Sequence, residues 1–217
     1  MRGIRWRLNT GLAAGLLFAA VPGLGKDRYS GFAALQAAEK PGEAFRVTAR
    51  DRGAPVTVLA VHGGGIEAGT AEVARAVAQE DWNLYLLEGL LGQDDGRLHV
   101  TSKHFDDPAA VALATAAVLA LSVHGSRDEG EGVCVGGSAR GPRRRVAQAL
   151  RAGGFSVEEP CRRLPGRSRR NIVNRAQRGG VQLELARGLR GALARDAGRL
   201  QAVCAHLRRG LQGAVAP

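Results

Sequence analysis

The segment Val56-Thr-Val-Leu-Ala-Val-His62-Gly-Gly-Gly-Ile-Glu67 decides how this chain folds. Its first six residues are rich in β-branched side chains and too few for an ordinary helix, which predicts a buried strand. His62 stands where the strand ends, and the glycines allow a sharp turn without a Cβ penalty. That turn can direct the Glu67 carboxylate to the same point as the His62 imidazole. An imidazole and a carboxylate are two of the three protein ligands that a catalytic zinc ion requires.

A second segment, residues 118–125, repeats this design. An apolar run ends in His124, and a glycine follows it. Because open α/β sheets bind their ligands at the carboxyl ends of strands, we expect His124 to be the third ligand. A His, Glu, His set with an open fourth position is typical of a hydrolytic zinc site. The sequence therefore predicts one Zn²⁺ ion held by His62, Glu67 and His124.

A third strand-like segment, residues 179–185, carries a carboxylate inside an apolar run. An isolated carboxylate is costly to bury, so Glu184 is expected to face a polar site. Beside a metal-bound water it would act first as a general base and then as a general acid.

Seven short segments, taken in order along the chain, carry a resemblance to a known family. They are residues 27–32, 61–67, 101–106, 122–125, 135–137, 171–175 and 179–185. Together they resemble the poly-γ-glutamate hydrolases of bacteria and their phages, over roughly residues 27–190. The resemblance implies a zinc-carboxypeptidase-like enzyme that cuts γ-linked glutamate chains. It also implies that His62, Glu67 and His124 hold the zinc and that Glu184 is the acid/base.

Three further residues are expected to contact the anionic substrate. The planar fork of arginine matches a carboxylate, and the resemblance favours Arg175, with Asn174 beside it, for that contact. The alternative for Arg175 is a solvated basic loop. His104 is expected to line the same cleft, and its alternative is a turn closed by Asp106 before Pro108.

The charge of the chain leaves two classes of partner open. The formal net charge is +11, nearly all of it from arginine, and such a surface attracts polyglutamate and nucleic acid alike. An aromatic content of 4% argues against a base-stacking platform, so no specific nucleic acid is expected. Residues 138–145 are unusually rich in arginine and depart from the family pattern, so the loop there is not predicted.

Length and patterning predict one catalytic domain, residues 26–217, expected to be a monomer. Alternating strands and helices indicate an α/β fold, a single open mixed β-sheet flanked by helices, which the resemblance makes zinc-carboxypeptidase-like. Helices are expected at 29–38, 71–79 with Thr70 as N-cap, 108–117, 142–152 with Pro142 first, and about 192–211. Strands are expected at 44–48, 56–61, 82–87, 98–101, 118–124, 132–135 and 179–185.

The N-terminus has the layout of a signal peptide, with a basic region, the apolar run 12–21 and a small-residue breaker at 22–25. The apolar run is too short for a transmembrane helix. This predicts a leader over residues 1–25 and a secreted or cell-envelope protein. The alternative is that these residues come from a start codon assigned too far upstream, or that they form an amphipathic N-terminal helix. Either would leave the protein in the cytoplasm. Three cysteines exclude a full disulfide framework, and we expect them to be structural with one possible bridge.

Other functions remain as alternatives to the zinc hydrolase of γ-linked polyglutamate. HGGG also forms oxyanion holes in serine hydrolases, but residues 136–140 lack the final glycine of the nucleophile motif. The zinc site could cut a different amide, such as one in peptidoglycan. A non-catalytic basic binding module would instead bind its partner in a salt-dependent way and would not need His62.

Overall fold

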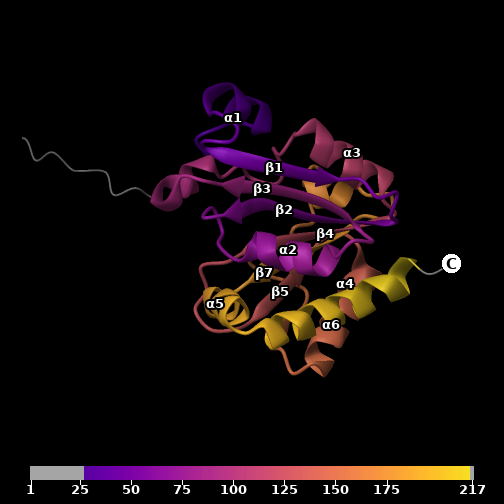
Figure 1. Cartoon of the computed structure of the whole chain (residues 1–217). Coiled ribbons are helices and arrows are strands. Elements are labelled where there is room, and N and C mark those ends of the chain that lie inside the picture. Colours follow the sequence, from indigo (N-terminus) through magenta and orange to yellow (C-terminus); the bar gives the residue numbers. More distant parts are fainter. Residues whose placement is uncertain (1–26, 216–217) are drawn as a thin grey trace, which may run out of the picture.

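The computed structural model describes residues 27–215, in which a seven-stranded mixed sheet lies between two layers of helices (Figure 1). The strands are β1 (Phe45–Arg50), β2 (Val56–Gly64), β3 (Asn83–Gly89), β4 (Leu119–Gly125), β5 (Val133–Gly136), β6 (Val157–Glu158) and β7 (Gly180–Leu185). The helices are α1 (Phe32–Ala38), α2 (Thr70–Ala78), α3 (Pro108–Ala116), α4 (Arg140–Ala152), α5 (Arg187–Arg195) and α6 (Ala197–Val215), with short 3₁₀ helices η1 (Gly92–Leu98) and η2 (Ile172–Arg175). The expected α/β class is confirmed, and the predicted leader lies outside the described residues.

The strand order, β1-β3-β2-β4-β7-β5-β6, places the segments that carry the candidate ligands side by side. Strands β3, β2, β4 and β7 are parallel to one another, whereas β1 and β5 run antiparallel to their neighbours β3 and β7. The carboxyl ends of β2, β4 and β7 therefore meet at one edge of the sheet. This is the edge at which open α/β sheets bind ligands.

Side chains that alternate along the strands supply two separate apolar cores. Val58 and Ala60 of β2 pack in the core that α2, α4, α5 and α6 cover. Leu59 and Val61 pack on the opposite face, beneath α1, α3 and η2. Figure 1 shows α1 and α3 on one side of the sheet and α2, α5 and α6 on the other. The two faces are called here the α2 face and the α3 face.

A bulge near the end of β2 changes the face to which its last residues point. The register with β3 pairs Ala60 with Leu86 and then Gly63 with Glu88, so β2 has one extra residue between these pairs. By strict alternation His62 would point to the α2 face, as Ala60 does. The bulge turns it to the α3 face, because an extra residue redirects the side chains that follow. His124 and Glu184 reach this face by ordinary alternation, two residues beyond Ser122 and Gln182.

Close packing against β3 explains why glycines follow His62. Gly64 has a φ of 63°, and a Cβ placed on it would lie 2.3 Å from the carbonyl oxygen of Gly89. A Cβ on Gly65 would lie 2.3 Å from an oxygen of the buried Asp95. Larger residues would push this turn away from the sheet, so the glycines are a steric requirement of the site.

Most predicted elements are confirmed with their ends shifted by a few residues, and two predictions are wrong. The strand expected at 98–101 is absent: η1 ends at Leu98, and the following residues run extended without joining the sheet. Asp95 accepts hydrogen bonds from the backbone N–H groups of Leu91 and Gly65, and this stabilises the turns of η1. The single helix expected at 192–211 is two helices, α5 and α6, which Asp196 separates.

Two helix starts also differ from the prediction. Pro142 is the third residue of α4 rather than its first, because the helix begins at Arg140 after an Ala139 N-cap. Thr70 is the first residue of α2, and Gly69 is its N-cap. The Thr70 hydroxyl donates to the carbonyl oxygen of His62 at 3.2 Å, so it ties the helix to the end of β2 instead of capping it.

One disulfide, Cys134–Cys161, joins β5 to the loop after β6, so the one bridge that the sequence left possible is present. Cys204 is a buried free thiol. Within residues 27–215 no helix is both long and apolar enough to cross a membrane.

Candidate metal centre

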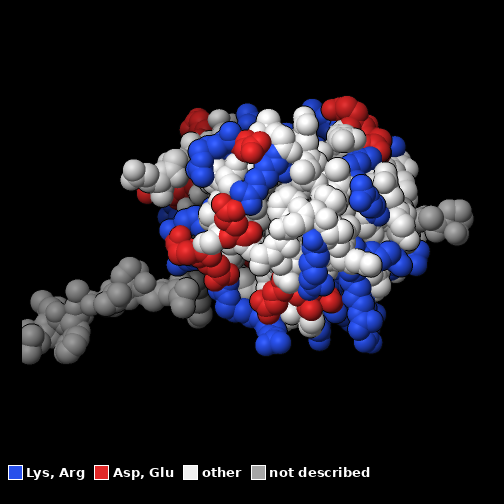
Figure 2. Space-filling model, turned by 90° about the horizontal axis from the view of Figure 1, so that it is seen from below, with Lys and Arg blue, Asp and Glu red and all other residues white. Residues whose placement is uncertain are grey.

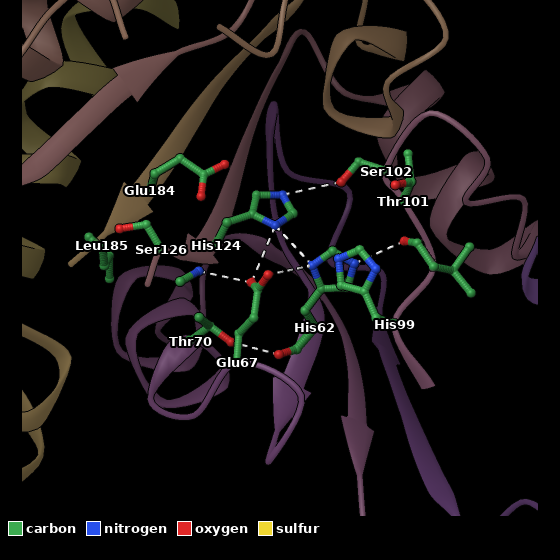
Figure 3. A network of polar contacts seen from close by, with 12 residues as sticks. His62, Glu67, Thr70, His99, Thr101, Ser102, His124, Ser126, Glu184 and Leu185 are labelled. Atoms are coloured by element: carbon green, nitrogen blue, oxygen red, sulfur yellow. Dashed lines mark hydrogen bonds and ion pairs between the residues drawn. The ribbon is translucent and has the colours of Figure 1, made fainter. Parts of the chain in front are cut away.

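His62, Glu67 and His124 point toward one another at the carboxyl edge of the sheet (Figure 3). The Nδ1 atom of His62 lies 3.1 Å from Nδ1 of His124 and 3.1 Å from a carboxylate oxygen of Glu67. Nδ1 of His124 lies 3.5 Å from the other oxygen of Glu67. The structure thus brings together the three residues that the sequence singled out.

These separations match the ligand shell of a tetrahedral zinc ion. Zinc–nitrogen and zinc–carboxylate bonds of about 2.0–2.1 Å at tetrahedral angles place neighbouring ligand atoms about 3.3 Å apart. Here the two Nδ1 atoms are 3.1 Å apart, and they lie 3.1 and 3.5 Å from the two different oxygens of the Glu67 carboxylate. Two imidazoles and one carboxylate, with a fourth position open, form the donor set of a hydrolytic zinc site.

Outer hydrogen bonds leave the Nδ1 atom of each imidazole free for a metal. Nε2 of His62 lies 2.9 Å from the carbonyl oxygen of Val100, and Nε2 of His124 lies 3.4 Å from the hydroxyl of Ser102. Glu67 accepts a 2.8 Å hydrogen bond from the backbone N–H of Gly125. Such partners orient metal ligands and fix the tautomer of each histidine. The extended segment after η1 therefore supports both histidines.

His99 is a member of this cluster that the sequence analysis missed. Its ring stacks on His62 with centroids 4.1 Å apart, and His62, Glu67 and His99 also form a group close enough to hold a metal ion. Its Nδ1 lies 2.7 Å from a carboxylate oxygen of Asp27, and the other oxygen accepts from the N–H of Thr101 at 2.6 Å. His124 fits better as the third ligand, because its Nδ1 faces both His62 and Glu67.

The charged groups of the cluster shift one another's pKa values. Burial alone would lower the pKa of His62, but the adjacent Glu67 carboxylate outweighs it, so the pKa is raised. Burial would raise the pKa of Glu67, yet His62 and His124 hold it well below its usual range. Burial, together with the neighbouring His62, lowers the pKa of His99. Glu67 is therefore ionised and ready to bind a cation.

Glu184 lies beside the ligands, on the strand next to His124. The two residues are register partners in the parallel pair β4–β7, and Figure 3 shows Glu184 on the far side of His124 from His62. The side chain is buried, and that burial raises its pKa. Gln182 donates a 2.8 Å hydrogen bond to one carboxylate oxygen and so fixes its orientation. A carboxyl group with a raised pKa next to a metal site is suited to accept and return a proton.

A hollow of about 220 Å³ opens at Glu184, between β5 and the loop after β4. Ser126, Cys134 and Glu158 are among its lining residues. Cys134 is the register partner of Glu184 across β5–β7, so the Cys134–Cys161 disulfide lies beside the candidate acid/base.

Arg190 of α5 holds the loops around the cluster, and the sequence analysis did not identify it. Its guanidinium donates to the carbonyl oxygens of Leu185, Ala68 and Ser126, which belong to three separate segments. Burial lowers its pKa, although the nearby Glu67 acts in the opposite direction. Arg190 is thus a structural clamp whose positive charge lies near the carboxylates of the site.

The three residues expected to bind substrate are not part of the cluster. The Asn174 side chain accepts from Ser138 and donates to the carbonyl oxygens of Gly166 and Ser168, so its amide already joins two loops. Arg175 and His104 are exposed. The backbone N–H of His104 closes a turn on Thr101. In the same stretch Asp107 caps α3, and the Asp106 carboxylate accepts a hydrogen bond from the backbone N–H of Ala33.

Comparisons with known proteins identify the relatives of this chain. A family model described as poly-gamma-glutamate hydrolase matches residues 29–202. The "UPF0714 protein YndL" of Bacillus subtilis (strain 168) is 36% identical over 77% of this chain and 67% of its own length. The "UPF0714 protein YmaC" of the same organism is 34% identical over 78% of this chain and 73% of its own.

Solved structures extend the likeness to the fold. "Structure of Bacteriophage poly-gamma-glutamate hydrolase" superposes with a TM-score of 0.82 at 31% identity, over 87% of this chain and 98% of that one. "YNDL-apo (Zinc-free)" gives a TM-score of 0.81 at 31% identity, over 88% and 100% of the two chains. Sequence, fold and site geometry therefore agree, and this chain belongs to the poly-gamma-glutamate hydrolase family.

Proposed function

We propose that this protein is a zinc-dependent hydrolase that cuts the amide bonds of γ-linked polyglutamate, with His62, Glu67 and His124 as the ligands of one zinc ion. The observation that carries the proposal is the approach of the two Nδ1 atoms to 3.1 Å from each other and to 3.1–3.5 Å from the Glu67 carboxylate, which suits a single tetrahedral ion. The names of the phage enzyme and of the zinc-free neighbour support the substrate and the metal.

The residues of this chain supply the proton transfers of the reaction. Zinc bound at this site would act as a Lewis acid toward the attacking water and the scissile carbonyl. Glu184 accepts the proton of that water and then donates it to the departing amine. The hydrogen bond from Gln182 holds one oxygen of Glu184, which leaves the other free for this exchange. The outer partners of His62 and His124 keep both rings oriented throughout.

Cationic side chains near the site would recognise the free carboxylates of the polymer. Arg175 is exposed and offers its guanidinium to solvent, which suits a bidentate contact with a carboxylate. We assign Asn174 a supporting role through the loops that it joins, and His104 an outer contact with the substrate.

We also propose that the mature protein is a monomer located outside the cytoplasm or in the cell envelope. The Cys134–Cys161 disulfide supports this location, because disulfides persist in oxidising compartments. Secretion would bring the enzyme to a polymeric substrate.

The test is an assay on γ-linked polyglutamate before and after chelation. The proposal predicts hydrolysis that a chelator abolishes, that added zinc restores, and that a serine-directed inhibitor does not affect. Zinc-dependent hydrolysis of amide bonds in peptidoglycan, without any hydrolysis of polyglutamate, would instead support the alternative substrate. Activity that survives chelation would overturn the metal mechanism.

The serine hydrolase is a weaker candidate on structural grounds. The hydroxyl of Ser138 donates to the Asn174 side chain at 2.9 Å rather than to a histidine. His206, the one histidine after Ser138 in the sequence, lies in α6 against Gly153 and Phe155.

A further inference from the structure

A second hollow, of about 450 Å³, lies where β5 ends and α4 begins. It is lined by Gly137, Ser138, Arg140, Arg143, Arg144, Glu159, Pro160 and Arg167. We call it the arginine cleft. Half of its lining residues come from the arginine-rich stretch 138–145, where the sequence left the loop before the predicted helix open.

Two charged residues that line the cleft, Arg143 and Glu159, form a buried ion pair. Arg143 is buried. Its guanidinium donates a hydrogen bond to a carboxylate oxygen of Glu159 at 2.6 Å and another to the carbonyl oxygen of Gly137 at 3.1 Å. Both side chains of this ion pair are at most 10% exposed. Glu159 is the one carboxylate that lines the cleft, and Arg143 neutralises it.

The other three arginines of the cleft carry charge that the described protein does not neutralise. Arg140, Arg144 and Arg167 are exposed, and within residues 27–215 none of their side chains makes an ion pair or a hydrogen bond. They converge on the cleft from two segments, the start of α4 and the loop after Cys161. Three unpaired guanidinium groups around one hollow form a binding site for anions, because each offers a planar set of donors that matches a carboxylate.

The positions of these charges do not favour the fold. Arg140 and Arg144 are two of the first five residues of α4, and the first turn has no acidic residue. The helix dipole disfavours cations at an N-terminus, so stability gives no reason for arginine there. Residues that oppose local stability are often retained for function.

The loop that carries Arg167 connects the cleft to the catalytic carboxylate. A Cβ on Gly166 would lie 2.7 Å from the Gln182 side chain, and Gln182 donates directly to Glu184. Gly136 pairs with Gln182 in the sheet, so Gly137 and Glu184 are about three residues apart along the strand direction. At roughly 3.3 Å per residue, this separation is about 10 Å.

We propose that the arginine cleft binds carboxylates of a γ-linked polyglutamate chain whose scissile bond lies at Glu184. This inference rests on the proposed function. The hollow beside Glu184 includes Asp128, Glu129 and Glu158 in its lining and repels an anionic chain, whereas the arginine cleft attracts it. A polymer would therefore extend from Glu184 toward α4, and a substrate of two or more units beyond the cut bond would reach the cleft.

Polyglutamate is a better match than nucleic acid for this site. On the face seen in Figure 2, Lys and Arg side chains are interspersed with Asp and Glu. A single cleft with three cations suits a flexible chain with one carboxylate per unit.

The test compares two double variants with the same loss of charge. Arg140→Gln with Arg144→Gln removes charge from the cleft. Arg145→Gln with Arg209→Gln removes it from exposed positions that do not line the cleft. Binding of labelled γ-linked polyglutamate is measured by fluorescence anisotropy in a Glu184→Gln background, which prevents cleavage. Cleavage of the polymer and of a γ-linked dimer is measured in the wild-type background.

We expect the cleft variant to weaken polymer binding by about five- to tenfold, as the loss of two carboxylate contacts implies, and the control variant by less than twofold. The cleft variant should raise KM for the polymer by a similar factor and leave cleavage of the dimer unchanged. Equal effects of the two variants, or no effect of either, would overturn the inference. Tighter binding of an oligonucleotide than of polyglutamate, with the same dependence on Arg140 and Arg144, would overturn it in favour of nucleic acid. Failure of the wild-type protein to cut the polymer would count against the proposed function itself. Wild-type cleavage of the polymer, with a polymer KM that the cleft variant leaves unchanged, would count against the cleft alone.

Discussion

Replacing Glu184 with glutamine tests the assignment of the acid/base with little change in shape. Glutamine keeps the size of glutamate, and its side-chain oxygen can still accept the hydrogen bond from Gln182. Removing a positioned general acid/base slows a reaction by about 10²- to 10⁴-fold, or roughly 3–5 kcal/mol in activation free energy. We therefore expect kcat on polyglutamate to fall by at least 10²-fold, while zinc binding persists.

The raised pKa of Glu184 sets the sign of two further effects. Burial makes the ionised carboxylate less favourable in the metal-free fold, so the wild-type protein loses stability as pH rises from the ordinary carboxyl pKa through the raised one. A neutral glutamine removes this loss, and Glu184→Gln should be at least as stable as wild type at neutral pH without zinc. In catalysis the base must be ionised, so wild-type activity should fall as acid protonates Glu184.

The measurements are steady-state kinetics on γ-linked polyglutamate, zinc content and thermal unfolding of each variant. Glu158→Gln is the matched control, because Glu158 lines the same hollow and the change removes the same charge. The control should retain most of its activity. A Glu184→Gln protein that binds zinc and keeps a tenth of wild-type kcat would refute the role given to Glu184.

Three other predictions follow from contacts around the site. Asp27→Asn weakens the support of His99 and of the segment after it, so zinc affinity should fall about tenfold in a competition assay with a chromophoric chelator, and unchanged affinity would contradict this support. Arg190→Gln leaves carbonyl oxygens of three segments without their donor, so the free energy of unfolding in urea should fall by about 1–3 kcal/mol, and a smaller loss would show that water replaces the clamp. Burial raises the pKa of Cys204 to about 12, so this thiol should resist alkylation at pH 8 in the native protein and react after unfolding; rapid native labelling would show that the α6 packing opens.

The sequence was sufficient for the central strands and for the residues that meet at their ends. His62 and His124 each end an apolar run, and Glu184 lies inside one. Parallel strands bring such positions to one edge of the sheet. His62, Glu67 and His124 could therefore be placed together before any contact was known. The glycines after His62 were also informative, because tight packing against β3 requires them.

The remaining features depend on pairings between distant residues. The β2 bulge that turns His62 to the α3 face is a mismatch in register with β3, and one strand alone does not reveal it. His99 is fixed by Asp27, 72 residues earlier, and its segment was wrongly predicted to be a strand. Arg190 was one arginine among many, and its role appears only when three loops present their carbonyl oxygens to it.

The central claim is that one zinc ion binds among His62, Glu67 and His124. Anomalous diffraction at the zinc edge, from crystals of the zinc-loaded protein, tests it most directly. The account predicts a single peak within about 2.0–2.2 Å of Nδ1 of His62, Nδ1 of His124 and a Glu67 oxygen. A peak that His99 binds in place of His124, two peaks in the site, or no peak at this edge of the sheet would contradict it.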